Sequence, residues 1–346
     1  MGSNCYRVLA LDGGGIRGLI PAAVLVEIET QMKRPIAKLF DLVAGTSTGG
    51  ILALGLTKRD PADPEKPQYR ACDMRDFYLR QGHKIFPRSL ARKLTTGFGL
   101  FGAKYSAVAL ETILKDKFGD AMLADALAEV VIPSYDLTGP GPYFFKSAYA
   151  KSEPEKWNVP VRDVARATSA APTYFDPAVF RAADGKGRHA LVDGGTFANN
   201  PTLAGYADGL RLGHDRPQIL VVSIGTGQPP QTPGSGVIPI EAAHAKRFGL
   251  LRWALPRRHE VPLLEVVMDG MPKAVEYQMN VLEMASSNAL VYYRLQSRLP
   301  TASHAMDDAS PGNTQKLLDD AGTLIAEQAA TLEQICTHLE GTGTEG

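Results

Sequence analysis

Apolar positions fall into two patterns along the chain: short continuous runs, and longer stretches with helical spacing. Residues 6–11 are mostly apolar without a helical period, which predicts a buried strand, and a helix is predicted to open at 19–21. A second apolar run at 40–44 leads into a helix-like run at 51–54. Strands that alternate with helices favour a mostly parallel sheet covered on both faces. The sequence therefore predicts an α/β fold.

The rest of the chain continues this alternation, and its length suits one domain because α/β domains of this size are often single. Within a single domain 1–346, we expect a motif-bearing core at about 6–227, a mainly helical part at about 240–339 and a disordered tail at 340–346. Further strands are predicted at 189–192, 219–224 and 289–295, and further helices at 73–118 with a loop interruption at 87–104, at 264–287 and at 314–339.

The most informative polar positions lie between the second apolar run and the helix that follows it. A Gly-x-Ser-x-Gly pattern occupies 45–49, and in a strand–turn–helix context this pattern is typical of a nucleophile elbow. Gly45 and Gly49 lack Cβ atoms, so strand and helix can approach closely there. The turn would push the Ser47 hydroxyl to the top of the sheet, near the positive end of a helix dipole. A structural turn or an anion-binding nest would use the same residue types.

A glycine-rich loop follows the first predicted strand. It contains Gly13, Gly14, Gly15, Arg17 and Gly18. Consecutive glycines expose backbone N–H groups without side-chain obstruction, and such donors can hold a developing oxyanion. The loop is therefore a candidate oxyanion hole.

The same glycines also fit the Gly-x-Gly-x-x-Gly fingerprint of dinucleotide-binding proteins. That fingerprint requires an acidic residue about 20 positions on, at the end of the second strand. Residues 31–35 carry no acid, and Glu27 and Glu29 fall inside the first predicted helix. An oxidoreductase, or a non-catalytic nucleotide-binding protein that keeps only the glycine loop, is thus the weaker alternative.

A third motif places an acid at the end of a predicted strand. Asp193 follows the run at 189–192 and precedes Gly194 and Gly195. An aspartate before two glycines is common in structural turns. Its position at a strand end would also let the carboxylate reach into a site.

Taken in this order, the three motifs make the chain resemble the patatin-like phospholipase family. The resemblance covers most of the chain, since family-like segments recur at 130–136, 167–175, 222–227 and 292–295. It implies a three-layer α/β/α fold and hydrolysis of lipid acyl esters by a Ser-Asp dyad. Carried over residue by residue, Ser47 is the nucleophile, Asp193 the base and Gly13–Gly15 the oxyanion hole. Arg17 occupies the basic position of the motif.

The Ser-Asp mechanism can also be argued from the chemistry of the two side chains, without the family resemblance. A serine hydroxyl needs a base to take its proton, and a carboxylate sheltered from water is basic enough to do so. A Ser-His-Asp triad is the nearest alternative, because Ser47, Asp193 and a later histidine would match the order of α/β-hydrolases. The histidines of the chain are His83, His189, His214, His244, His259, His304 and His338, and none stands at an obvious strand end with a glycine-rich turn.

Composition further limits the class of protein and the partners that we expect. Hydrophobic residues make up 44% of the 346, enough for a sizeable core, and 37 basic residues balance 37 acidic ones, so a nucleic-acid polymer is not an expected partner. The three cysteines are far apart and form no metal pattern, which suits free thiols in a reducing cytoplasm. We expect no metal and no organic cofactor.

Two segments could meet a lipid surface. Residues 246–258 carry five positive charges and no negative ones among apolar and aromatic residues, a composition typical of an interfacial membrane segment. The loop at 87–104 mixes four basic residues with exposed aromatics. A buried helix with a basic outer face and an ordinary solvated loop are the respective alternatives. A Pro/Gly-rich loop at 228–236 separates the last core strand from the first of these segments.

The expected partner is thus membrane phospholipid, met from the cytoplasm at the inner membrane surface. No apolar run reaches the length needed to span a bilayer. The chain also resembles phospholipase effectors of anti-phage systems, which a cyclic nucleotide switches on; that resemblance implies an activator that the motifs do not require. A homo-oligomer is left open.

Overall fold

The computed structural model describes residues 5–87, 102–185, 187–228 and 262–341, and it is built around one twisted sheet. The strand order is β5-β6-β3-β2-β1-β7-β8, with β4 paired to β3. The strands are β1 (Cys5–Leu11), β2 (Leu42–Gly45), β3 (Glu129–Asp136), β4 (Gly141–Lys146), β5 (Ala178–Arg181), β6 (Arg188–Asp193), β7 (Gln218–Ile224) and β8 (Leu290–Leu295).

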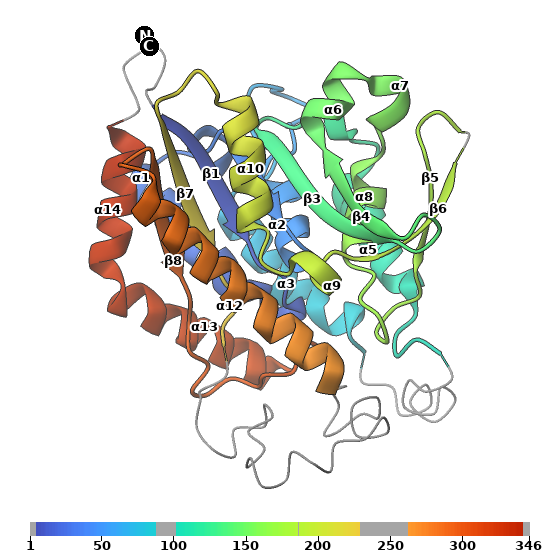
Figure 1. Ribbon diagram of the computed structural model, residues 1–346. Coiled ribbons are helices and arrows are strands. Elements are labelled where there is room, and N and C mark those ends of the chain that lie inside the picture. The colour runs from blue at the N-terminus through green and yellow to red at the C-terminus, as the bar shows by residue number, and fades with distance from the viewer. Residues whose placement is uncertain (1–4, 88–101, 186, 229–261, 342–346) are drawn as a thin grey trace, which may run out of the picture.

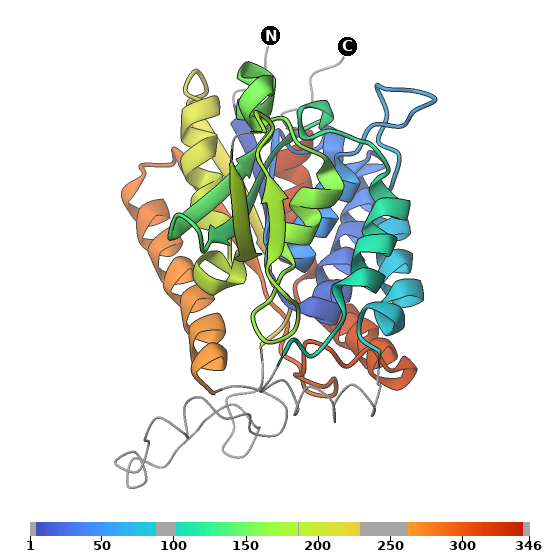
Figure 2. The ribbon, with the colours of Figure 1, turned by 90° about the vertical axis from the view of Figure 1, so that its right-hand side faces the viewer.

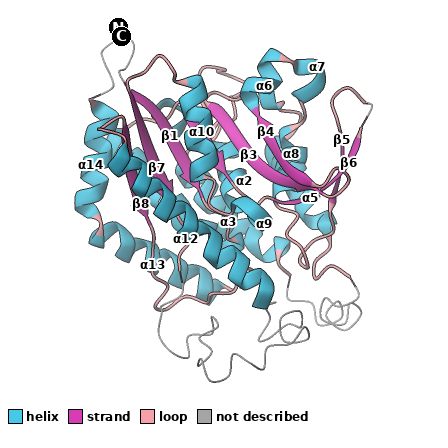
Figure 3. Cartoon of the chain, in the orientation of Figure 1, coloured by secondary structure: helices cyan, strands magenta, loops and turns pink. Residues whose placement is uncertain are grey.

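The central pairings of this sheet are parallel, as the sequence predicted. β1 pairs in parallel with both β2 and β7, β2 with β3, and β7 with β8. Antiparallel pairs are confined to the side of the sheet that holds β4, β5 and β6 (Figure 3). The predicted α/β fold with a mostly parallel sheet is therefore confirmed.

Helices cover both faces of the sheet. α10 and α12 lie on one face, and α1, α2, α3, α5 and α8 lie on the other (Figures 1 and 2). The helices are α1 (Leu19–Met32), α2 (Thr48–Leu56), α3 (Ala71–Ile85), α5 (Ala107–Phe118), α6 (Ser147–Ser152), α7 (Pro154–Trp157), α8 (Val161–Thr168), α9 (Gly195–Ala198), α10 (Thr202–Leu212), α12 (Pro262–Ala285), α13 (Pro311–Glu327) and α14 (Ala329–Glu340).

Two cores arise from the two-residue period of the strands. Side chains of a strand point alternately to opposite faces. In β1, Leu9 and Leu11 belong to the larger core under α1 and α2, and Val8 and Ala10 belong to the smaller core under α10. Because both faces are covered, β1 reads as a continuous apolar run, which is why it could be found in the sequence.

The carboxyl ends of the parallel strands gather the polar residues. β1 ends at Asp12 and the glycine loop, whose last four residues form a short 3-10 helix (Gly15–Gly18), and β2 ends at the serine turn. β7 and β8 end at the same edge, beside β1. Open α/β sheets bind their ligands at this edge.

The C-terminal part differs from the prediction in one respect. The single helix predicted at 314–339 is wrong: α13 ends at Glu327, Gln328 leaves the helical conformation and α14 begins at Ala329. Both helices pack against α1, and a straight helix would carry one of them away from it. β8, which was predicted within this mainly helical part, joins the central sheet beside β7.

Several predicted segments lie outside the described residues. They are most of the loop at 87–104, nearly all of 228–236, the whole basic segment at 246–258 and most of the tail at 340–346. Among the helices that the structure describes, none has the length and apolar character needed to cross a bilayer.

Candidate active site

The turn after β2 has the geometry of an elbow. Ser47 adopts φ 54° and ψ −119°, a conformation that L-residues rarely take and that often stores strain at functional sites. A Cβ atom on Gly45 would overlap the Gly49 carbonyl, and one on Gly49 would overlap the Leu11 carbonyl. Both glycines are therefore required for strand β2 and helix α2 to approach, as the sequence suggested. The backbone N–H of Ser47 donates to Thr168 Oγ1 at 3.0 Å.

Strand pairing brings Asp193 to the serine. β4 occupies one edge of β3 along residues 131–136, so β2 and β6 must share the other edge, one after the other. β6 runs antiparallel to β3 and ends opposite Ser134, just beyond the end of β2. Ser47 Oγ consequently donates a hydrogen bond to Asp193 Oδ2 at 2.6 Å, although the two residues are 146 positions apart.

The Asp193 carboxylate is held in a buried setting. Its side chain has 2% exposure, and Oδ1 accepts a hydrogen bond from the Gly195 N–H at 2.7 Å. Burial raises the pKa of Asp193 to about 7, an effect that the hydrogen bonds from Ser47 and Gly195 only partly oppose. The carboxyl group therefore changes charge near neutral pH, where a general base works best.

The backbone N–H groups of the glycine loop differ in whether they already donate a hydrogen bond within the protein. The N–H of Gly13 donates to the Asn199 carbonyl at 2.9 Å, so this predicted oxyanion donor is already used. The N–H groups of Gly14 and Gly15 donate to no other residue in the described part of the chain. Both glycines line a pocket together with Ser47 and Asp193.

The two remaining residues of the predicted loop have supporting positions. A Cβ atom on Gly18 would overlap the Thr48 hydroxyl, so Gly18 permits the 3-10 turn to lie against α2. Arg17 Nε is 3.5 Å from the Gly14 carbonyl, at the limit of a hydrogen bond.

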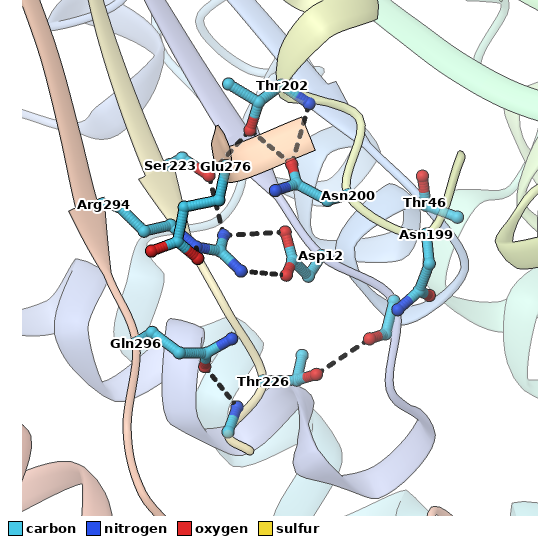
Figure 4. A network of polar contacts seen from close by, with 12 residues as sticks. Asp12, Thr46, Asn199, Asn200, Thr202, Ser223, Thr226, Glu276, Arg294 and Gln296 are labelled. Atoms are coloured by element: carbon cyan, nitrogen blue, oxygen red, sulfur yellow. Dashed lines mark hydrogen bonds and ion pairs between the residues drawn. The ribbon is translucent and has the colours of Figure 1, made fainter. Parts of the chain in front are cut away.

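A buried polar network behind the loop was missed in the sequence. Figure 4 shows Arg294, from β8, with its guanidinium directed at Asp12, the residue that precedes the glycines. Two hydrogen bonds of 3.0 and 2.6 Å join them, and Arg294 also donates to Ser223 Oγ at 2.7 Å. Glu276 of α12 lies 3.9 Å from Arg294 Nε. The C-terminal strand and helix therefore help to place the start of the loop.

The end of β7 supplies a second support. Thr226 Oγ1 donates to the Gly13 carbonyl at 2.8 Å, and Gln296 Oε1 accepts from the Gly227 N–H at 2.8 Å (Figure 4). The only sequence signal for these residues was that polar side chains follow the ends of two neighbouring parallel strands. That signal does not say which of them face the loop.

Arg294→Ala should lower the free energy of unfolding by about 3–5 kcal/mol, because it would leave the Asp12 carboxylate buried without its counter-ion. Urea denaturation measures this change. The exposed pair of Lys66 with Asp63 is the control, since Lys66→Ala should leave the stability nearly unchanged. Equal, small effects of the two variants would contradict a structural role for the buried pair.

The pocket beside Ser47 is mostly apolar. Ile51, Ile85, Leu110, Phe175 and Met306 are among the residues that line it, and they come from α2, α3, α5 and two loops. Such a lining favours an apolar group next to the Ser47–Asp193 pair.

The described histidines do not join this pair. His189 Nδ1 lies 2.6 Å from Asp136 Oδ2, and none of the five described histidines hydrogen-bonds to Ser47 or Asp193. His244 and His259 lie outside the described residues. Over the residues that the structure covers, no group of three or more His, Cys, Asp or Glu side chains could hold a metal ion.

Comparisons with known proteins show the family of this chain. A family model described as patatin-like phospholipase matches residues 9–206. The chain is 32% identical to "Patatin-like protein 2" of Arabidopsis thaliana, over 92% of this chain and 82% of that protein. It is also 30% identical to "Probable inactive patatin-3-Kuras 1" of Solanum tuberosum, over 93% and 87% of the two chains. Among solved structures, human GIVD cytosolic phospholipase A2 aligns with a TM-score of 0.47 at 12% identity, over 97% of this chain and 60% of that one.

The family model covers both the glycine loop and the serine elbow, so the loop is part of this family's pattern and the dinucleotide-binding alternative is set aside. The chain therefore belongs to the patatin-like phospholipase family, whose enzymes hydrolyse lipid esters.

Proposed function

We propose that this protein hydrolyses ester bonds of membrane phospholipids through an acyl-enzyme on Ser47, with Asp193 as the only general base. One observation carries the proposal: the 2.6 Å hydrogen bond from Ser47 Oγ, at a strained elbow, to the buried Asp193 carboxylate. A serine becomes a competent nucleophile when a neighbouring base takes its proton. Because a relative is named a probable inactive patatin, the proposal rests on this pair and not on family membership alone.

The reaction would proceed in two halves. Asp193 takes the Ser47 proton as Oγ attacks the ester carbonyl, and then gives that proton to the departing alcohol. A water molecule next loses a proton to Asp193 and attacks the acyl carbon; the Ser47 Oγ–carbon bond breaks, and Oγ regains the proton. The N–H groups of Gly14 and Gly15 would hold the carbonyl oxygen while it carries negative charge.

The apolar pocket supports a lipid substrate. Its lining leaves few polar groups other than those of the reacting centre, which suits a fatty-acyl chain better than a polar acyl group. Phospholipids carry such chains, and their ester bonds lie near the bilayer surface. We therefore place the protein's activity at the membrane surface, reached from the aqueous side.

Release of fatty acid from mixed phospholipid vesicles tests the proposal. Wild-type protein should release fatty acid and folded Ser47→Ala protein should not. The same assay, repeated with a panel of cyclic dinucleotides, tests activation by a cyclic nucleotide: we propose that such a ligand raises the rate, and a rate that no member of the panel changes would contradict this. Ordinary release by Ser47→Ala would overturn the proposed nucleophile.

The activity should depend on pH through Asp193. Only the ionised carboxylate can accept the Ser47 proton, so kcat/KM should fall about tenfold per pH unit as the pH drops below about 7 and level off above it. A pH series with a small soluble ester measures this fall in kcat/KM without interference from vesicle properties. An inflection near 4, the ordinary range of an aspartate, would show that burial does not raise the pKa of the catalytic carboxyl group.

The free energy of unfolding, unlike the activity, should decrease as the pH rises toward 7. The pKa of Asp193 is higher in the folded than in the unfolded protein, so the folded state binds the proton more tightly and loses stability as the pH rises from about 4 to about 7. The upper bound on this loss is about 4 kcal/mol. Asp193→Asn should therefore be more stable than the wild type at pH 8, and thermal unfolding at two pH values measures the difference.

A further inference from the structure

We propose that Ser169 is a third polar residue of this active centre, whose hydroxyl holds the oxygen that leaves in acylation and attacks in deacylation. The inference rests on the proposed function of Ser47 and Asp193. It adds a residue to the Ser47–Asp193 dyad.

The position of Ser169 follows from its two neighbours in sequence. Thr168, the last residue of α8, accepts the N–H of Ser47 on its hydroxyl at 3.0 Å. The carbonyl of Ala170 accepts the N–H of Asp193 at 3.0 Å. Ser169 thus stands between the residue that fixes the nucleophile and the residue that fixes the base.

The hydroxyl of Ser169 has no hydrogen-bond partner in the described part of the chain. The residue is 8% exposed, and Oγ forms no hydrogen bond with any described residue. Its main chain is fully engaged, because its N–H donates to the Ala165 carbonyl and its own carbonyl accepts from Ala171. Leaving a buried hydroxyl unpaired costs free energy, which a ligand that binds to it would recover.

The pocket identifies what that ligand is. Ser169 lines the same pocket as Ser47, Asp193, Gly14 and Gly15. The two glycine N–H groups would hold the carbonyl oxygen, and Asp193 would hold the proton. The oxygen of the departing alcohol, whose place the attacking water takes in deacylation, would have Asp193 as its proton partner and no second protein group to orient it.

A hydroxyl suits this oxygen in both halves of the reaction. It can donate to the alcohol oxygen as the carbon–oxygen bond breaks, and it can accept from, or donate to, the water that follows. No proton needs to be transferred to Ser169, since Asp193 carries it in both directions. Ser169 would therefore orient an oxygen and would not act as an acid or a base.

Ser169→Ala should show this role with p-nitrophenyl butyrate. Nitrophenolate leaves readily without help, so acylation should stay nearly unchanged while deacylation slows by about 10-fold, the value of one hydrogen bond to a polar ligand. In the steady state, kcat and KM should fall together. Intact-mass spectrometry should find a larger share of the enzyme acylated than in the wild type. An unchanged kcat, or a lower kcat without more acyl-enzyme, would overturn the inference.

Two variants make the result specific. Ser147→Ala removes another buried serine hydroxyl, one that accepts from the Val130 N–H at 2.8 Å and does not line the pocket, and it should not accumulate acyl-enzyme. Ser169→Cys keeps the size of the side chain with a weaker hydrogen-bonding group and should fall between the wild type and Ser169→Ala. Should Ser47→Ala hydrolyse the ester at the wild-type rate, the proposed function itself fails, and not only the role of Ser169.

Discussion

Ser47→Ala and Asp193→Asn should each lower kcat for phospholipid hydrolysis by on the order of 10^4-fold or more, and the double variant should lose little beyond that. The reason is that the 2.6 Å hydrogen bond makes the two side chains one unit: a serine without its base is a weak nucleophile, and the base alone has nothing to activate. Fatty-acid release from vesicles, measured with each variant at equal concentration, gives the comparison.

Two controls separate chemistry from folding. Ser147→Ala and Asp215→Asn make the same chemical changes at a buried site outside the pocket lining and at an exposed site, and both should retain activity. Thermal unfolding should show that Ser47→Ala and Asp193→Asn are folded. Additive losses in the double variant would mean that the two residues act independently, and an equal loss on changing a single histidine would favour a Ser-His-Asp triad.

Gly14→Ala should lower kcat by roughly 100- to 1,000-fold while KM changes little, because an oxyanion donor acts mainly in the transition state. The structure gives the physical cause. A Cβ atom on Gly14 would lie 2.6 Å from Thr226 Cβ and would overlap its hydroxyl, so the loop must move away from β7 and carry its N–H groups with it. Initial rates with a soluble ester over a range of concentrations separate kcat from KM.

The matched control for this change is Gly322→Ala. Gly322 lies in α13 with open space around it, so the same added methyl group should leave kcat unaltered and should favour the helix slightly. A Gly14→Ala protein with a raised KM and an unchanged kcat would place the loop in substrate binding instead. Tight binding of a dinucleotide to the wild type, lost in this variant, would revive the alternative set aside above.

The parts of the site that the sequence predicted are those with a local cause. The elbow could be recognised because Gly45 and Gly49 are required by contacts within a few residues of Ser47 and with the adjacent strand β1. The strand β1 could be recognised because a strand covered on both faces has few polar positions. In both cases the residues of a short stretch of sequence are enough to predict its local structure.

The parts that could not be predicted depend on distant pairing. Asp193 was proposed from its turn, but its contact with Ser47 depends on β6 following β2 along one edge of β3. Gly13 was expected to offer a donor, and only the fold shows that Asn199 takes it. Arg294 looked like an ordinary strand residue, because nothing near it in the sequence reveals the carboxylate of Asp12.

The error in the last helix has a similar cause. Buried positions recur at 317, 321, 324, 332, 335 and 339, spacings that fit one continuous helical stripe across Gln328. No glycine or proline marks the break between α13 and α14. Only the presence of α1, against which both helices pack, requires the turn.

The position of β1 within the sheet has a practical consequence for anyone who shortens this protein to its recognisable family region. That region stops at residue 206, before β7 begins at Gln218, and β7 covers the side of β1 that β2 leaves free. A protein ended there would expose seven residues of apolar strand backbone as an unprotected edge. Such an edge recruits further copies by strand addition, so the shortened protein should form insoluble aggregates and not an inactive soluble monomer.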